Sequence, residues 1–139
     1  VYYTVVDYSD PAKIAEVLRT APGKLSLGEM FTLANTLEPG SKEYLEVFDI
    51  AVRLYPDNAI ANLNAANTAL MQRDYTRAGS YLTKAGDSPE ADYLRGVFHA
   101  LNNDYTTAMP LLRKAAAAGL KQADDALSQI ETKKLDKTK

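Results

Sequence analysis

Apolar residues recur along most of this chain at the three- and four-residue spacings of amphipathic α-helices. One such face follows the i, i+3, i+4, i+7 spacing and consists of Leu27, Met30, Phe31 and Ala34. Short stretches that contain proline, glycine or asparagine separate these segments and are typical of turns between helices. The pattern therefore predicts an all-α protein made of several short helices.

Capping residues indicate where the predicted helices begin. Asp10 followed by Pro11 favours the start of a first helix, and Ser26 with Glu29 has the spacing of a capping box at the start of a second. Eight helices are predicted, at about residues 11–20, 27–37, 42–55, 58–73, 75–85, 89–102, 105–118 and 120–131.

Two residues predict local backbone features near the seventh of these helices. Pro110 lies early in the segment 105–118 and lacks an amide hydrogen, which predicts a kink or a frayed first turn. Gly119 is expected to end this helix in the left-handed conformation that glycine adopts at little cost.

The first eight residues, VYYTVVDY, differ in composition from the rest of the chain. They are β-branched and aromatic, which favours an extended strand. A lone strand cannot pair its own backbone groups, so it either augments a neighbour or is the closing strand of a preceding domain. We expect an extended segment over residues 1–9, a helical repeat domain over 10–131 and a flexible, lysine-rich tail over 132–139.

The helical part of the chain repeats itself. Three positions with matching spacing recur 34 residues later and again 30 residues after that. They are occupied by Tyr44, Phe48 and Ala51, then by Ala78, Leu82 and Ala85, and then by Ala108, Leu112 and Ala115. Residues 74–78 and 104–108 also share the sequence Asp-Tyr-Thr followed by an alanine at the fifth position. A fixed period with small residues at fixed positions is typical of stacked helix pairs.

The segment from Tyr44 to Pro56 resembles the second helix of a tetratricopeptide repeat, whose period is 34 residues. The resemblance covers about residues 26–118, and the stretch 114–127 is also similar to the related Sel1-type repeat. It implies an all-α, right-handed stack of three antiparallel helix hairpins, a tetratricopeptide-like solenoid preceded by the short extended segment. A leading helix and a capping helix would flank the hairpins, and stacks of this kind usually present a surface to another molecule.

Residues 27–130 taken together resemble the C-terminal helical domain of cell-envelope proteins from anaerobic gut bacteria, which follows an OmpA-like segment. This resemblance implies a periplasmic or outer-membrane-associated setting. It also implies that VYYTVVDY is the last strand of an upstream domain.

The amino-acid composition argues against several classes of partner and of functional site. Lysine and arginine number 16 against 18 for aspartate and glutamate, so the net charge of −2 gives no electrostatic reason to bind nucleic acid or anionic lipid. No run of about 18 apolar residues is present, so direct membrane insertion is not expected. The chain has no cysteine, which excludes disulfides, thiolate metal sites and cysteine nucleophiles.

The residues that could support catalysis or metal binding are more simply explained by helix packing, helix capping or exposure to solvent. His99 is the only histidine and lies mid-helix among apolar residues, while the serines with the clearest roles are expected to cap helices: Ser26, Ser41 and Ser88. Glu43, Glu46 and Asp49 share a helical face that could hold a hard cation, although a solvated surface is the simpler interpretation. The sequence therefore predicts no enzyme, no catalytic or metal-binding residue and no cofactor.

The predicted helix 58–73 contains three asparagines, Asn62, Asn64 and Asn67, although asparagine is a poor helix former. Two interpretations are open: their amides hold the backbone of an extended partner, or they bridge neighbouring helices inside the fold. The tetratricopeptide resemblance places the first helix of each pair on the concave face. It thereby implies an exposed groove that contains Leu33, Leu63, Asn67, Leu70, Tyr93 and Val97, with Glu29 beside it.

These observations favour a non-catalytic module of a larger cell-envelope protein that binds a protein or peptide partner. The alternative is a structural spacer or self-association domain with no ligand in its groove. A binding groove should keep Leu33, Leu63 and Tyr93 exposed, whereas in a spacer they should be covered.

Overall fold

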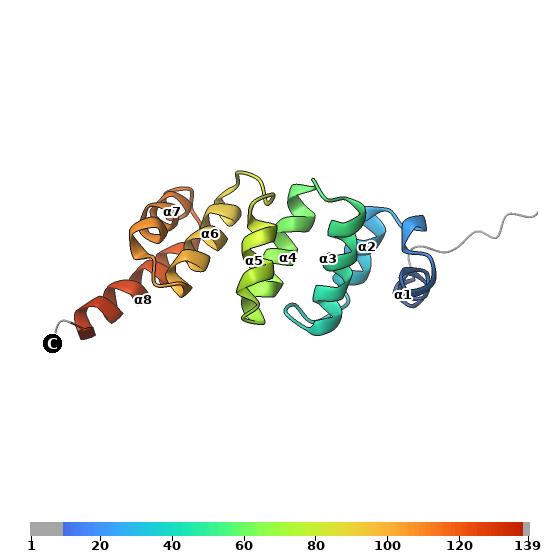
Figure 1. Cartoon of the computed structure of the whole chain (residues 1–139), viewed down its shortest axis with the longest axis horizontal. Helices are drawn as coiled ribbons and strands as arrows, with labels where there is room; N and C mark the ends of the chain where they lie inside the picture. The colour runs from blue at the N-terminus through green and yellow to red at the C-terminus, as the bar shows by residue number, and fades with distance from the viewer. Residues whose placement is uncertain (1–9, 138–139) are drawn as a thin grey trace, which may run out of the picture.

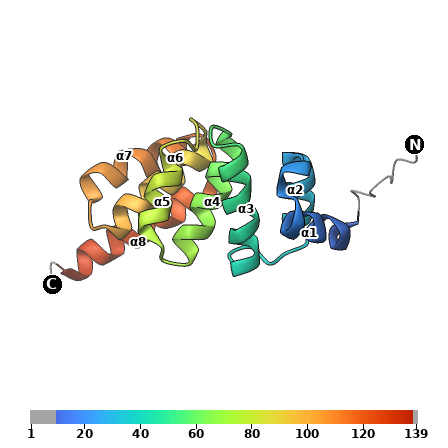
Figure 2. The same ribbon diagram turned by 45° about the vertical axis from the view of Figure 1, so that its right-hand side comes forward.

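The computed structural model describes residues 10–137, with side chains described as far as Thr132. Over this range the chain is helical and contains no β-strand (Figures 1 and 2). Its helices are α1 (Pro11–Thr20), the 3-10 turn η1 (Pro22–Lys24), α2 (Leu27–Ala34), α3 (Lys42–Leu54), α4 (Ala59–Met71), α5 (Tyr75–Leu82), α6 (Pro89–Leu101), α7 (Tyr105–Ala117) and α8 (Lys121–Lys137). The all-α prediction is confirmed, and the strand predicted for VYYTVVDY lies outside the described residues.

The helices are arranged in chain order along one long axis, with α1 at one end and α8 at the other (Figure 1). Three hairpins pack in succession, namely α2 with α3, α4 with α5, and α6 with α7. α1 packs against α2, and α8 packs against both α6 and α7. The predicted stack of helix hairpins between a leading helix and a capping helix is therefore present. None of the described helices has both the length and the apolar character needed to cross a membrane.

Polar side chains cap the helix starts, including those of Ser41 and Ser88, which the sequence predicted as caps. The Ala12 amide donates to Asp10 at 3.0 Å. At α2 the Glu29 amide donates to the Ser26 hydroxyl at 3.2 Å, and the Ser26 amide donates to the Glu29 carboxylate at 2.8 Å, which completes the capping box. Equivalent side-chain caps at α3 to α7 come from Ser41, Asn58, Asp74, Ser88 and Asp104. Each cap of this kind typically contributes about 1 kcal/mol.

Three helix ends differ from the prediction by three residues or more. α2 stops at Ala34, not at residue 37. α5 stops at Leu82, not at Ala85, because the Arg95 guanidinium of α6 donates to the Leu82 carbonyl at 2.8 Å and to the Gly86 carbonyl at 2.8 Å. A cation at a helix C-terminus satisfies carbonyls that have no intrahelical partner. α8 continues to Lys137, beyond residue 131 where the helical domain was expected to end.

The predictions for α7 have mixed outcomes. Gly119 has a φ of 99°, which confirms the left-handed end. The frayed first turn considered for Pro110 is wrong, because α7 is continuous and the Thr107 amide donates to Asp104 at 3.2 Å. Thr106 and Pro110 are both exposed, so water can satisfy the carbonyl that loses its partner at the proline.

The repeat alanines lie where helices touch. Ala78 and Ala108, which hold the same position in successive repeats, are fully buried, and so are Ala51 and Ala115 at a second shared position. Gly96 of α6 allows a close approach to α7, since a Cβ atom there would lie 2.7 Å from the Leu112 side chain. Small residues at these contacts let neighbouring helices pack at short distance.

The core consists of two clusters that meet at α6. The larger runs from Ile14 of α1 to Leu94 of α6, and the smaller joins Met109, Leu112 and Ile130 of α7 and α8. Tyr93 and Val97 pack against both clusters. α6 therefore connects the hairpins to the capping helix, and its surface residues lie at the junction.

Candidate partner-binding site

Two neighbouring cavities lie on the face formed by α4, α6 and α8. The smaller, about 210 Å³, lies between α4 and α6, with part of its wall from the segment that leads into α8; we call it the α4–α6 cavity. The larger, about 290 Å³, lies between α6, α7 and α8; we call it the α6–α8 cavity. Tyr93 and Gln122 line both, so the two cavities meet at these side chains.

Four of the six residues predicted for the groove lie at these cavities. Leu63 and Asn67 of α4 and Tyr93 of α6 line the α4–α6 cavity. Val97 lines the α6–α8 cavity together with Tyr93. All four side chains are half-buried. The structure thus brings residues from two hairpins into one partly open surface.

The other two predicted groove residues are in the core, so their expected exposure is wrong. Leu33 is 5% exposed and Leu70 is 8% exposed. α2 packs against α1 and α3, and α4 packs against α3, α5 and α6, which leaves these leucines covered. Glu29 is occupied in the capping box of α2 and does not line either cavity.

The three asparagines of α4 divide between the two interpretations. Asn62 is 2% exposed and donates to the carbonyls of Pro56 at 3.1 Å and Asn58 at 2.8 Å, so it fixes the loop that precedes α4. Asn64 donates to Ile60 in its own helix at 2.9 Å and accepts from the Tyr44 hydroxyl at 3.5 Å. Both therefore have roles inside the fold, and Asn64 also lines the α4–α6 cavity.

Asn67 differs from these two asparagines. Within the part of the chain that the structure describes, its amide makes no hydrogen bond, and its side chain lines the α4–α6 cavity. An amide group of this kind can donate to and accept from one peptide unit of another chain. Asn67 is therefore the residue of this trio whose hydrogen-bonding capacity is available at the surface.

The charged residues that line the two cavities are acidic. Glu90 lines the α4–α6 cavity and Asp125 lines the α6–α8 cavity, while no lysine or arginine lines either in the described part of the chain. Burial raises the pKa of Tyr93, and the Asp125 carboxylate raises it further. The Tyr93 phenol is consequently neutral at physiological pH and can donate a hydrogen bond at the junction of the cavities.

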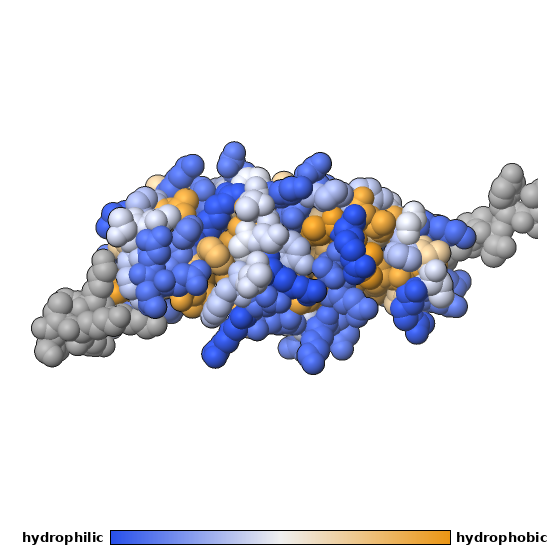
Figure 3. Space-filling model, viewed as in Figure 1, coloured by the Kyte–Doolittle hydropathy of each residue, from blue (hydrophilic) through white to orange (hydrophobic). Residues whose placement is uncertain are grey.

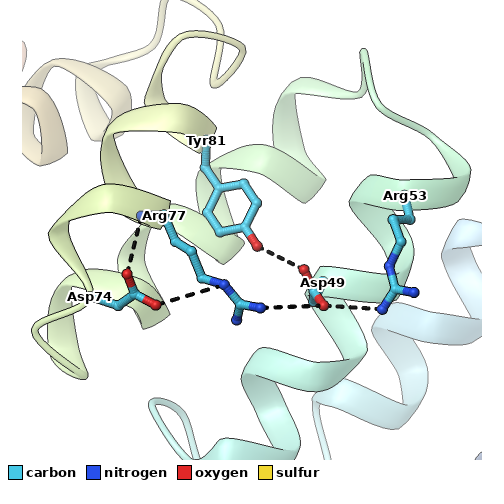
Figure 4. A network of polar contacts seen from close by, with 5 residues as sticks. All are labelled: Asp49, Arg53, Asp74, Arg77 and Tyr81. Carbon is cyan, nitrogen blue, oxygen red and sulfur yellow. Dashed lines mark hydrogen bonds and ion pairs between the residues drawn. The ribbon is translucent and has the colours of Figure 1, made fainter.

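The residues considered for catalysis or metal binding make contacts within the fold. His99 Nδ1 lies 3.5 Å from Asp104 Oδ2, and Asp104 also caps α7. Hydrogen bonds from the Thr107 side chain and backbone lower the pKa of Asp104, and the nearby His99 lowers it further. Asp49, considered for a cation site, instead accepts from Tyr81 and pairs with Arg53 and Arg77 (Figure 4). No cluster of three or more His, Cys, Asp or Glu residues that could hold a metal occurs among the described residues.

A different face of the molecule is largely hydrophilic. In the view of Figure 3, polar side chains cover most of the surface, and apolar atoms gather mainly over the region of α2 and α3. A polar cavity of about 240 Å³ lies between α3 and α5, and its wall contains residues of both charges, including Lys42, Asp49 and Arg77. Because Asp49 already has its partners within the fold, this cavity is a weaker candidate than the α4–α6–α8 face.

α8 contributes side chains that were not among the groove residues predicted from the sequence. Gln122, Asp125 and Gln129 of this helix line the α6–α8 cavity. These three residues follow an i, i+3, i+7 spacing, so their shared face was detectable in the sequence. The spacing could not indicate that this face of α8 lies toward α6.

Comparison with known proteins supports the helical-repeat interpretation. The tetratricopeptide repeat family model matches residues 45–90, which extend from α3 to the start of α6. A comparison with curated proteins found no match. Repeats of this type generally mediate protein–protein interactions, and their folds are typically non-catalytic. The chain thus contains a tetratricopeptide-type repeat within an all-helical, tetratricopeptide-like stack.

Proposed function

We propose that this chain is a non-catalytic interaction module that holds an extended segment of a partner protein against the α4–α6 cavity. The observation that carries this proposal is the Asn67 amide, which has no hydrogen bond within the described fold and lies beside Leu63 and Tyr93. An extended segment exposes peptide groups that match the donor and acceptor of an asparagine amide.

The surrounding side chains suit such a partner. Tyr93 offers a half-buried ring with a polar tip, a combination that is common among residues that dominate binding energies. Leu63 provides apolar surface next to it. Since α4 and α6 are anchored by fully buried alanines such as Ala65, Ala69 and Ala91, these side chains are presented on a rigid support.

The proposed setting is a larger cell-envelope protein, in the periplasm or at the outer membrane. Its support is the resemblance of residues 27–130 to the helical domain of OmpA-linked envelope proteins. Fractionation of cells that produce the full-length protein tests this setting. Recovery in the cytoplasmic fraction alone would contradict it.

A structural spacer or self-association domain is the second candidate. The burial of Leu33 favours it, because a spacer should have this residue covered. The partial exposure of Leu63 and Tyr93 favours the binding module. Sedimentation of the chain over a range of concentrations tests self-association, since a self-association domain should form oligomers whose proportion rises with concentration.

The binding function is tested by affinity capture from an envelope extract with the full-length protein and with its Tyr93→Ala variant. A partner recovered by the wild type should bind the variant about 5- to 30-fold more weakly. Circular dichroism should show the same helical content in both proteins. Equal binding by the two proteins would contradict a partner site at the α4–α6 cavity.

A further inference from the structure

The larger cavity has walls that suit a long side chain with a polar end. Val97, Leu101 and Ile130 give it apolar sides, and Tyr93 adds an aromatic ring. Gln122 and Asp125 of α8 supply polar groups. At about 290 Å³ it is at the small end of ligand pockets, which is a suitable size for one side chain of a partner.

The charged residues around this cavity favour a positively charged partner side chain. Asp125 is the charged residue that lines it within the described part of the chain, and Glu90 lines the adjoining cavity. Two basic side chains of the neighbouring helices have other contacts: Lys114 Nζ lies 3.6 Å from Asp92, and Arg95 binds backbone carbonyls at the end of α5. Arg113 of α7 and Lys121 of α8 do not line the cavity. The negative charge of Asp125 is therefore not compensated by a basic residue that lines the cavity.

We propose that the α6–α8 cavity receives the cationic side chain of a lysine or arginine from the partner segment. The Asp125 carboxylate would bind the ammonium or guanidinium group, and the Tyr93 ring would provide a cation–π contact. The apolar walls would cover the methylene groups, as they do where long basic side chains lie along apolar surface. This inference rests on the proposed function, because Tyr93 and Gln122 connect this cavity to the α4–α6 cavity.

The test uses small probes, so it does not depend on an identified partner. The isotope-labelled protein is titrated with Nα-acetyl-arginine amide, Nα-acetyl-lysine amide and the uncharged analogue Nα-acetyl-norleucine amide, while amide chemical shifts are recorded by NMR. We expect at least one cationic probe to bind with a Kd on the order of 1 mM. The affected amides should include those of Gln122, Asp125 and Gln129. The norleucine probe should bind at least about tenfold more weakly.

Asp125→Asn is the decisive variant, and Asp124→Asn is its matched control. Both remove one negative charge from α8, but Asp124 does not line the cavity. Asp125→Asn should weaken the cationic probe about tenfold, whereas Asp124→Asn should change its Kd by less than about twofold. Circular dichroism of both variants checks that the helices are intact.

Three results would overturn the inference: equal affinity for the norleucine and cationic probes, equal effects of the two variants, or shifts scattered away from α6 and α8. The first of these would make the cavity a site for apolar side chains. A partner that binds at Asn67 while the cationic probes fail would leave the proposed function standing. Cationic probes that bind while Tyr93→Ala and Asn67→Ala retain full partner affinity would contradict the proposed function instead.

Discussion

The Tyr81 hydroxyl donates a 2.9 Å hydrogen bond to Asp49 Oδ1, which joins α5 to α3 (Figure 4). These are the second helices of two successive hairpins. The other carboxylate oxygen of Asp49 lies 3.1 Å from Arg53 and 3.9 Å from Arg77. The two hairpins are therefore connected by a polar contact in addition to their buried alanines.

Tyr81→Phe should lower the free energy of unfolding by about 1 to 2 kcal/mol, because Asp49 loses a donor within a half-buried contact. Urea denaturation measures the change. Tyr75→Phe is the matched control, since the Tyr75 hydroxyl makes no hydrogen bond within the described residues and its removal should change stability by less than about 0.5 kcal/mol. Equal effects of the two substitutions would show that the Asp49 contact does not stabilise the stack.

The same contact should give the protein a dependence on alkaline pH. Burial and the hydrogen bond to Asp49 raise the pKa of Tyr81 from 10.0 to about 12. A raised folded-state pKa stabilises the fold below the unfolded value, and this stabilisation is lost as pH rises from about 10 toward 12. The difference in unfolding free energy between wild type and Tyr81→Phe should therefore decrease over this interval.

Near-ultraviolet absorbance of the phenolate provides a direct check of this titration. The difference between the wild-type and Tyr81→Phe curves isolates one tyrosine, and its midpoint should lie at about 12. A difference curve centred at the ordinary value of 10.0 would contradict the hydrogen bond between Tyr81 and Asp49.

Enlarging the repeat alanines should disrupt the helix contacts. Ala78→Phe and Ala108→Phe place a large ring at fully buried positions and should each lower stability by about 1 to 3 kcal/mol or more. Ala117→Phe, at an exposed position of α7, is the control. If Ala78→Phe and Ala108→Phe melt at the temperature of the wild type, the alignment of the helix pairs is wrong.

Two glycine-to-alanine changes should have opposite signs. At Gly96 the new Cβ would meet Leu112 at 2.7 Å, so overpacking should outweigh the gain in helix propensity and lower stability by about 1 kcal/mol. At Gly28, in the first turn of α2, only the Ser26 hydroxyl oxygen lies near, at 3.9 Å, so alanine should stabilise by a few tenths to about 1 kcal/mol. Melting temperatures of the two variants that move in the same direction would contradict this explanation.

Much of the fold could be predicted from the sequence because it depends on residues that lie close together along the chain. A cap such as Ser26 with Glu29 acts over three residues, and repeated alanines mark helix contacts wherever they recur. The end of α5 was not predictable in this way. It depends on Arg95, which is 13 residues away along the chain and reaches the Leu82 carbonyl only in the folded stack.

The candidate site was predictable only in part, because periodicity gives the face of a helix and not what covers that face. Leu33 and Leu63 both satisfy the pattern of a concave surface, yet Leu33 is buried while Leu63 stays half-exposed at the α4–α6 cavity. Asp125 was overlooked for the same reason. Its position at the α6–α8 cavity follows from how α8 packs against α6, a contact between segments distant in sequence.

The central claim, that Asn67 serves a partner and not the fold, is tested most directly by two quantities measured on the same variant: melting temperature and partner affinity. Asn62→Ala is the internal comparison, because Asn62 is a buried asparagine of the same helix with two hydrogen bonds. Asn67→Ala should keep the wild-type melting temperature and bind the partner about 5- to 30-fold more weakly, a loss of about 1 to 2 kcal/mol. Asn62→Ala should melt at a lower temperature with unchanged affinity. An Asn67→Ala protein that is destabilised but retains full affinity would contradict the account.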